Sequence, residues 1–368
     1  MDPDPNPNGT FVDFAGGVQV LDGEELRAAA ALLLAGVCAA GAAGNLLVLL
    51  ILARDFHASR GSEAKALLAS VATTDALILL LCAPVRALAV YKQAWVLGRF
   101  ACATADWFQH SCLAAKTLVL AVGTRARHTP EPGAPRRGWI VWAVALVWLV
   151  SAMFPIPQML FAELRPRGGR DAVVCVYRTP ACASHFAAVF YKIYPAAVYV
   201  APALFAVACY TKSLHRALNY APSPRRQSKV TLVLLCLSGT LGLMLLPEWG
   251  TFTWVRLGYR KPPAGLLLCA QLLAYACSAL SPVLLVSTYD DVRRGLAALC
   301  AAAACRGAKA AGAPKAGEGN GAELGGGGGG ADGEKTFPDV EHFWTGRRNT
   351  QVEEEQDPVP WETEEKML

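Results

Sequence analysis

Charged residues are scarce in this chain of 368 residues, because only 17% of them are Asp, Glu, Lys or Arg. A soluble globular domain carries roughly 25%. Hydrophobic residues make up 54% of the chain, so the composition excludes an ordinary soluble domain and indicates a membrane protein. The net charge of +5 is spread along the chain, and no basic stripe with interleaved aromatic residues is present. This pattern argues against a nucleic-acid-binding protein.

The sequence also lacks the short motifs of common enzymes. No nucleophile elbow, zinc-protease motif or glycine-rich phosphate loop occurs in a suitable context. Asp106 and His110 share one face of an expected helix, but neither a nucleophile nor a set of metal ligands accompanies them. We therefore expect no catalytic residues, no metal site and no cofactor, and we do not expect an enzyme.

The amino terminus lacks the features of a cleavable signal peptide. Residues 1–6 contain neither a basic region nor an apolar core. A glycosylation sequon at Asn8-Gly9-Thr10 would be used only on the luminal side of the membrane. We expect residues 1–27 to form an extracellular amino terminus, glycosylated at Asn8.

Long apolar segments dominate the rest of the chain. There are seven of them, each of about the length of a tilted membrane helix. An odd number of spans places the termini on opposite sides, so the carboxyl terminus is expected in the cytosol and the protein in the plasma membrane. The sequence predicts an all-α membrane protein, with a seven-transmembrane helix bundle over residues 28–288. The predicted spans are 28–53, 66–91, 102–127, 138–161, 186–211, 230–255 and 264–287.

A short amphipathic helix is expected directly after the seventh span. Over residues 289–300, Val292, Leu296 and Leu299 share one face, as in a helix that lies on the membrane surface and contacts lipid. Cys300 and Cys305 are candidates for palmitoylation there, and the alternative is a pair of unmodified thiols.

The carboxyl-terminal region, residues 301–368, is predicted to be a disordered cytosolic tail. Its first part is rich in Ala and Gly, which is typical of a flexible linker. Aromatic residues among acidic ones at 337–344 and 357–362 favour docking peptides for a cytosolic tail-binding protein. A disordered tail with chance aromatic residues has the same composition.

Two ionisable residues are expected deep in the membrane at matching depth. Asp75 lies about 15 Å from the cytosolic end of the second span, and Lys116 lies about 16 Å from the same side in the third span. A carboxylate and an ammonium that are unpaired in hydrocarbon each cost several kcal/mol. We therefore predict an internal salt bridge between Asp75 and Lys116.

A second group of polar and aromatic residues is expected nearer the extracellular face. Polar groups that converge among aromatic side chains are typical of a ligand pocket. The alternative is that these groups hydrogen-bond to one another in a structural network, and the sequence leaves both interpretations open. The predicted pocket residues are Arg86, Asp106, Gln109, His110, Lys192, Glu248, Trp249, Phe252 and Gln271.

Several residues together resemble class A, rhodopsin-like G-protein-coupled receptors. They lie in the predicted spans, except for Trp95 in the first outer loop: Gly44-Asn45, Asp75, Trp95, Cys102, Arg127, Trp148, Pro202, Tyr210, Pro247 and Pro282. A closer resemblance, to an orphan group related to the galanin receptors, includes Phe14-Ala15-Gly16-Gly17, Ala83-Pro84-Val85-Arg86 and the tail motifs. The resemblance implies a receptor for an extracellular ligand, a peptide by the likeness to galanin receptors.

The resemblance also implies roles for individual residues. Cys102 would form a disulfide with a cysteine of the second outer loop, with Cys175 preferred over Cys182. Arg127 and Tyr210 would meet a heterotrimeric G protein, which is of the inhibitory type by the likeness to galanin receptors. The outer loops carry several basic residues, Arg256 among them, and would favour an acidic ligand or form an ordinary solvated surface.

Three motifs of the resembled family are altered in this chain. Ala126 precedes Arg127 where the family has an acidic residue, and the sixth-span motif reads Met244-Leu245-Leu246-Pro247, with Leu245 in place of the switch tryptophan. The seventh-span motif reads Ser281-Pro282-Val283-Leu284-Leu285, without the family's asparagine and tyrosine. The alternative function is therefore a weakly signalling pseudo-receptor, or a membrane scaffold that works through its tail.

Overall fold

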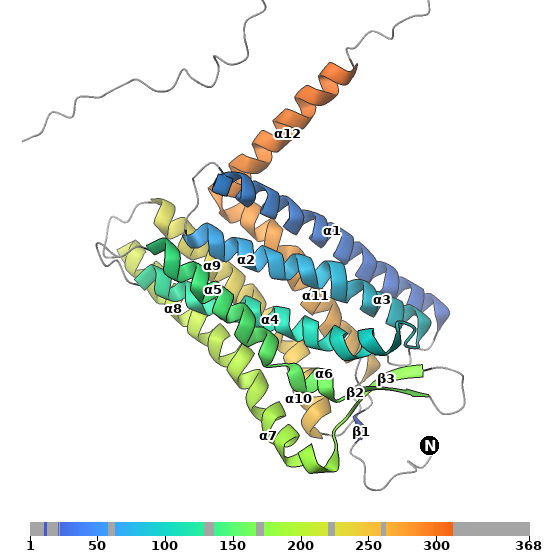
Figure 1. Cartoon of the computed structure of the whole chain (residues 1–368). Coiled ribbons are helices and arrows are strands. Elements are labelled where there is room, and N and C mark those ends of the chain that lie inside the picture. The colour runs from blue at the N-terminus through green and yellow to red at the C-terminus, as the bar shows by residue number, and fades with distance from the viewer. Residues whose placement is uncertain are drawn as a thin grey trace, which may run out of the picture. The chain divides into compact units, whose positions relative to one another are not determined.

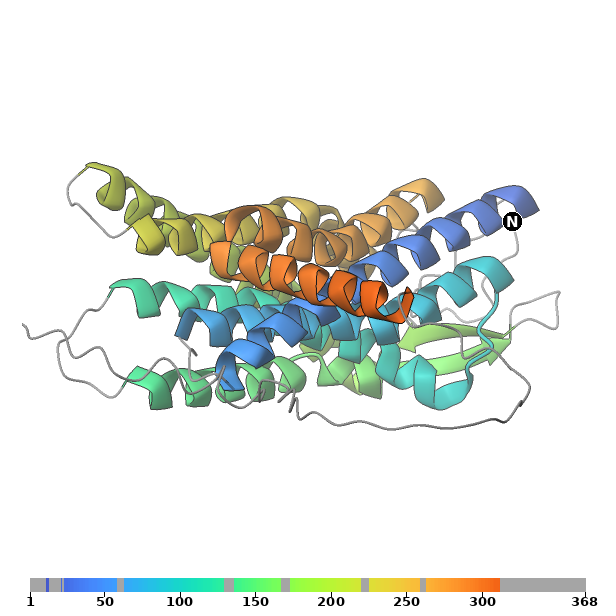
Figure 2. The same ribbon diagram turned by 90° about the horizontal axis from the view of Figure 1, so that it is seen from above.

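The structure is a computed structural model that describes residues 11–12, 21, 23–57, 63–128, 136–166, 173–219, 225–258 and 263–311. Helices of membrane length lie side by side in a bundle, and a short sheet lies at one end of it (Figures 1 and 2). The first three spans are α1 (Glu24–His57), α2 with α3 (Glu63–Leu77, Ala83–Lys92) and α4 (Gly98–His128). The other four are α5 with α6 (Arg136–Met153, Ile156–Leu160), α7 with α8 (Ser184–Pro195, Ala201–Asn219), α9 with α10 (Arg225–Met244, Leu246–Gly258) and α11 (Ala264–Thr288).

The composition of α4 differs from that of the other spans. Among the described residues, six helical segments are long and apolar enough to cross a membrane, and α4 is not one of them. It has 31 residues, about 46 Å of helix, but it carries Asp106, His110 and Lys116 in its interior. Its neighbours α2, α5, α6 and α8 pack around it. The most polar span is therefore surrounded by other helices, which keeps its ionisable side chains away from lipid.

Two spans are interrupted by π-helical turns beside prolines. Ile78–Cys82 separates α2 from α3 just before Pro84, and Ala196–Val200 separates α7 from α8 just after Pro195. Proline removes a helical hydrogen bond, and a π turn accommodates the resulting change of direction.

Helices α1 and α11 approach closely because α1 has a glycine at the contact. A Cβ added at Gly41 would lie 2.6 Å from the Cβ of Ala279, too close for any larger residue. Asn45, one turn later, donates from Nδ2 to the carbonyl oxygens of Gly41 (2.9 Å) and Ser278 (3.0 Å). The buried amide therefore links the first span to the seventh.

A small antiparallel sheet, which the sequence analysis did not predict, follows the fourth span. Strands β2 (Ala162–Pro166) and β3 (Val173–Arg178) form a hairpin, and β1 (Phe11–Val12) pairs with the other edge of β3. The run from Val173 to Tyr177 is rich in β-branched residues, which favour a strand. The disulfide between Cys102 and Cys175 attaches β3 to the start of α4.

Helix α12 (Asp290–Ala311) follows the seventh span, and it continues beyond residue 300. Val292 is fully buried, while Arg293 and Arg294 are exposed, so the helix is amphipathic. Asp290 accepts a hydrogen bond from Lys229 of α9, which holds the pKa of that carboxyl below its ordinary value. Asp291 lies 3.4 Å from Lys65 of α2. These ion pairs connect the start of α12 to the nearby ends of two spans.

Candidate functional site

A buried polar contact inside the bundle joins Asp75 and Lys116. Lys116 Nζ lies 2.7 Å from Asp75 Oδ1 and 3.2 Å from Ser281 Oγ. The two charged side chains are 0% and 2% exposed. Because Asp75 lies on α2, Lys116 on α4 and Ser281 on α11, one ammonium holds three spans together. The depth argument from sequence placed the same two residues opposite each other.

A second ionic contact lies nearer the sheet. The guanidinium of Arg86 pairs with Asp106 Oδ1, and the Tyr177 hydroxyl donates to Asp106 Oδ2 over 2.9 Å. Within the described part of the chain, Arg86 Nη1 is buried without a hydrogen-bond partner. Asp106 is thus held from two directions, by α3 and by β3, while Arg86 keeps one unused donor.

Arg256 lies inside the molecule rather than in the solvated outer loops, so the sequence-based placement of this residue was wrong. It is 6% exposed, and its guanidinium carbon lies 3.5 Å from the centre of the Tyr177 ring. It donates from Nη1 to the Tyr191 hydroxyl over 3.2 Å. Three aromatic rings surround this cation, which compensates part of the cost of removing it from water.

His110 is enclosed by aromatic rings from two other spans. Its ring centre lies 5.1 Å from that of Phe252, 5.5 Å from that of Trp249 and 6.4 Å from that of Tyr194. Its Nδ1 lies 2.8 Å from the carbonyl oxygen of Asp106, and a carbonyl only accepts, so Nδ1 is the donor. In the neutral ring Nε2 is then an acceptor, and among the described residues neither Nε2 nor the Tyr194 hydroxyl has a partner.

The remaining predicted pocket residues divide into two groups. Gln109 and Gln271 are buried, and Gln109 Oε1 accepts from the Tyr275 hydroxyl over 2.9 Å. Glu248 is partly buried in the first turn of α10. Lys192 is the exception, because it is exposed on α7 and is not brought into the buried cluster.

Four functional candidates were missing from the sequence-based set or misplaced in it: Tyr177, Tyr191, Tyr194 and Arg256. Tyr177 could have been found, because it follows Cys175 by two residues and therefore shares its face of a strand. Tyr191 and Tyr194 lie one helical turn apart on α7, but only the packing of α7 against α10 shows that they face Arg256 and Trp249.

The other predicted sites are only partly visible. The Cys102–Cys175 disulfide is present, with 5.6 Å between the Cα atoms, and Cys182 is free and exposed. Tyr210 is buried and its hydroxyl donates to the Leu120 carbonyl oxygen over 2.7 Å. Cys300 is exposed on α12. Asn8, the tail segments 337–344 and 357–362, and the side chains of Arg127 and Cys305 lie outside the described residues.

Replacing Tyr177 with phenylalanine is expected to lower the free energy of unfolding by about 1.5–3 kcal/mol, because a buried carboxylate loses a hydrogen bond. The ring and its contact with Arg256 remain. Thermal unfolding of the purified protein measures the effect, and Tyr91→Phe on exposed Tyr91 is the matched control. Equal stability of the two variants would show that the Tyr177 hydroxyl does not support Asp106.

Comparison with known proteins gives a consistent set of relatives. Residues 44–285 match the protein family described as 7 transmembrane receptor (rhodopsin family). The chain is 30% identical over 400 residues to the G-protein coupled receptor 151 protein of Mus musculus, covering 98% of this chain and 94% of that protein. It is 29% identical over 305 residues to G-protein coupled receptor 151 of Homo sapiens, covering 79% and 72%. Galanin receptor type 1 of Rattus norvegicus is 23% identical over 277 residues, covering 70% and 78%.

Proposed function

The chain belongs to the rhodopsin family of seven-transmembrane receptors, and from that premise we propose that it binds an extracellular peptide and activates a heterotrimeric G protein of the inhibitory type. A member of this family is a multi-pass membrane receptor and not an enzyme. The proposed location is the plasma membrane, with the amino terminus outside and the carboxyl terminus in the cytosol.

The observation that carries the ligand proposal is the set of unused polar atoms in the outer cluster. Arg86 Nη1, His110 Nε2 and the Tyr194 hydroxyl are buried, lie on three different spans, and have no partner in the described part of the chain. An unpaired buried polar group costs about 1–3 kcal/mol. A ligand that supplies the missing acceptors and donors recovers that cost and gains specificity. A peptide offers both kinds of group, as well as apolar side chains for the aromatic rings.

The proposed route of signalling runs through the polar centre of the bundle. The Asp75–Lys116 contact lies between the outer cluster and the cytosolic ends of the spans and ties α2, α4 and α11 together. We assign it the role of a restraint on the inactive arrangement. Arg127, near the cytosolic end of α4, and Tyr210, in the middle of α8, are the residues proposed to respond to the G protein.

The ligand proposal is tested with a library of extracellular peptides on cells that express the receptor, with inhibitory G-protein activation as the readout. A peptide that activates the wild type is expected to lose at least about tenfold in potency at His110→Ala, since an unpaired polar group costs about 1–3 kcal/mol. Lys192→Ala, at an exposed residue of α7, is the matched control. A peptide with equal potency on wild type and His110→Ala would place its binding elsewhere.

The altered motifs favour a second function, that of a membrane scaffold acting through its tail. Leu245 at the switch position is only 1% exposed, but a leucine side chain contacts fewer neighbouring residues than the tryptophan that it replaces, so it transmits a pocket movement less effectively. A scaffold would bind its cytosolic partner equally well with and without Arg127→Ala. A receptor would lose G-protein activation in that variant, so this substitution separates the two functions.

A further inference from the structure

Arg256 differs from the other buried basic side chains in the described part of the chain, because no carboxylate pairs with it there. The buried lysines and arginines are Lys65, Arg86, Lys116 and Arg256. Each of the first three forms an ion pair with an aspartate. A charge removed from water is costly unless an opposite charge and hydrogen bonds compensate it. The described residues therefore compensate the burial of Arg256 only in part.

The aromatic groups around Arg256 do not replace an anion. Its guanidinium carbon lies 3.5 Å from the centre of the Tyr177 ring, 4.9 Å from that of Tyr191 and 5.3 Å from that of Phe252. The face of an aromatic ring is only partially negative, whereas a carboxylate carries a full charge. An anion would therefore add to the stabilisation that the rings already provide.

The two carboxylates of the outer cluster do not supply that anion. Asp106 is already bonded at both oxygens, to Arg86 at Oδ1 and to the Tyr177 hydroxyl at Oδ2. Glu248 precedes Arg256 by eight residues on α10, a separation of about 12 Å along the helix axis. Within the described part of the chain, the counterion of Arg256 has to come from another molecule.

Arg256 and Tyr191 retain the hydrogen-bond donors that a carboxylate needs. A guanidinium has five N–H donors in one plane, and among the described contacts Arg256 uses one, from Nη1 to the Tyr191 hydroxyl over 3.2 Å. The Tyr191 hydroxyl accepts that bond and keeps its own hydrogen to donate. The Tyr177 ring covers a face of the guanidinium and leaves its edge free, and this edge binds both oxygens of a carboxylate.

The position of Arg256 suits a group that arrives from outside the cell. Arg256 lies two residues before the end of α10 at Gly258, and Tyr177 lies on β3 of the outer hairpin. Phe252 connects this position to the outer cluster, because its ring centre also lies 5.1 Å from that of His110. One ligand can therefore reach both His110 and Arg256.

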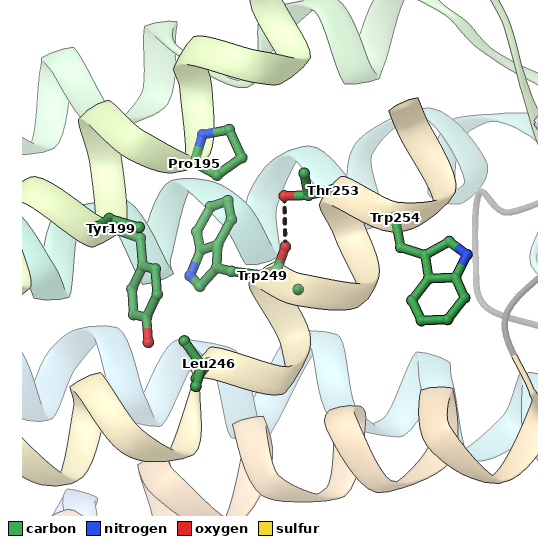
Figure 3. Close-up of a pocket in the computed structure, with 8 residues that line it drawn as sticks. Pro195, Tyr199, Leu246, Trp249, Thr253 and Trp254 are labelled. Carbon is green, nitrogen blue, oxygen red and sulfur yellow. Dashed lines mark hydrogen bonds between the residues drawn. The ribbon is translucent and has the colours of Figure 1, made fainter. Parts of the chain in front are cut away.

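A pocket beside α10 is not part of this site. Figure 3 shows its lining, with Pro195 and Trp249 close together. The Thr253 hydroxyl in it donates to the Trp249 carbonyl oxygen over 2.8 Å. None of its lining residues is an acid or a base, and Arg256 is not one of them. A carboxylate finds no cation in that pocket, whereas Arg256 offers one.

We propose that Arg256 and Tyr191 bind a carboxylate group of the extracellular ligand. This inference rests on the proposed function, and it adds the chemical class of one group that the peptide must carry. The carboxylate is either an Asp or Glu side chain or the free carboxyl terminus of the peptide. The sequence left open whether the outer basic residues favour an acidic ligand or form a solvated surface. Burial without a carboxylate partner in the described part of the chain favours the acidic ligand.

The first test uses propionate as the probe, because it has the carboxylate and the short stem of an acidic side chain. Propionamide, of the same shape without the charge, is its control. The unfolding temperature of the full-length protein in detergent is measured against the concentration of each. Propionate is expected to stabilise wild type, and Arg256→Gln is expected to need at least about tenfold more of it, because a charge-assisted hydrogen bond is lost. Arg99→Gln, at an exposed residue of α4, is expected to respond as wild type does.

A second variant covers the case in which Arg256→Gln folds poorly. Tyr191→Phe keeps the ring beside the guanidinium and removes only the hydroxyl, so it is expected to need about two- to tenfold more propionate. The proposal is overturned if propionate stabilises wild type no more than propionamide does, or if Arg256→Gln responds to propionate as wild type does. If Arg256→Gln does not fold, a wild-type response of Tyr191→Phe overturns it.

A peptide selection then identifies the source of the carboxylate and separates this proposal from the proposed function. Random peptides with free or with amidated carboxyl ends are bound to wild type and to Arg256→Gln without a G protein. Peptides retained by wild type are expected to bind Arg256→Gln at least about tenfold more weakly. Retention from the amidated pool assigns the carboxylate to a side chain, and retention from the free pool alone assigns it to the terminus.

Equal binding of the retained peptides to wild type and Arg256→Gln would overturn the carboxylate site. If wild type retains no peptide but responds to propionate through Arg256, the proposed peptide ligand is wrong and the carboxylate site stands.

Discussion

Replacing Lys116 with methionine is expected to lower the free energy of unfolding by about 3–5 kcal/mol. Methionine has a similar length, so the change removes the ammonium with little change of packing. It leaves Asp75, which is 0% exposed, as a buried carboxylate without its cation. The contact with Ser281 on α11 is lost as well. The cost arises mainly from the uncompensated charge and not from the loss of an attractive pair.

The effect is measured by chemical or thermal unfolding of the purified protein. The charges of Lys116 and Asp75 are removed singly and together. Adding Asp75→Asn to Lys116→Met is expected to recover a large part of the loss, because no buried charge is then left unpaired. Lys212→Met, at an exposed residue of α8, is the matched control and is expected to change stability by less than about 0.5 kcal/mol. Additive losses in the double variant would contradict a buried ion pair.

Replacing both Cys102 and Cys175 with serine is expected to cost about 4 kcal/mol of stability. The disulfide closes a loop with a sequence separation of 73 residues, and long loops lose the most entropy on closure. It also fixes β3, which carries Tyr177 to Asp106. Without it, the hairpin is attached to α4 only through weaker contacts, and the outer cluster loses one of its two supports for Asp106.

The disulfide prediction is measured as the fraction of receptor that reaches the cell surface and as the unfolding temperature of the purified variant. Cys182→Ser is the matched control, because Cys182 is free and exposed. Its surface expression and unfolding temperature are expected to equal those of wild type. A loss with Cys182→Ser as large as that with the double variant would mean that Cys182, and not Cys175, forms the disulfide.

Regular features of the fold could be predicted from the sequence because they depend on length and depth alone. Seven apolar segments of membrane length predict the bundle, and each of them overlaps a long helix or a pair of consecutive helices in the structure. Asp75 and Lys116 could be matched because the rise of a helix converts residue number into depth. Helix α4 is less apolar than the other spans because ionisable residues, Lys116 among them, lie in its interior, and such residues are kept away from lipid.

The features that were missed depend on direction rather than depth. The π-helical turns at Ile78–Cys82 and Ala196–Val200 rotate the rest of each span, so the face that a residue presents could not be counted from its number. Lys192, which lies before the turn of its own span, was therefore expected inside and is exposed. Arg256 was expected outside for another reason, because α10 continues to Gly258, beyond the predicted end of the sixth span at residue 255. The hairpin was missed because its strands are short and lie between spans.

The proposed restraint at Lys116 also has a consequence for ligand discovery. If a single ammonium holds α2, α4 and α11 together, most of the receptor population occupies the inactive arrangement without a ligand. A ligand then has to supply the free energy that separates the two arrangements. Under the proposed function, Lys116→Ser is expected to weaken the restraint and to make the receptor more sensitive in a peptide screen.

The most direct measurement of the central claim is basal inhibitory G-protein activation in cells that express wild type or Lys116→Ser at matched surface density. Lys116→Ser is expected to signal above wild type, because loss of the ammonium releases the three spans. Adding Arg127→Ala is expected to return that signal to the level of cells without receptor. Basal signalling of Lys116→Ser no higher than that of wild type would contradict the account, because the Asp75–Lys116 contact would then not restrain a competent receptor.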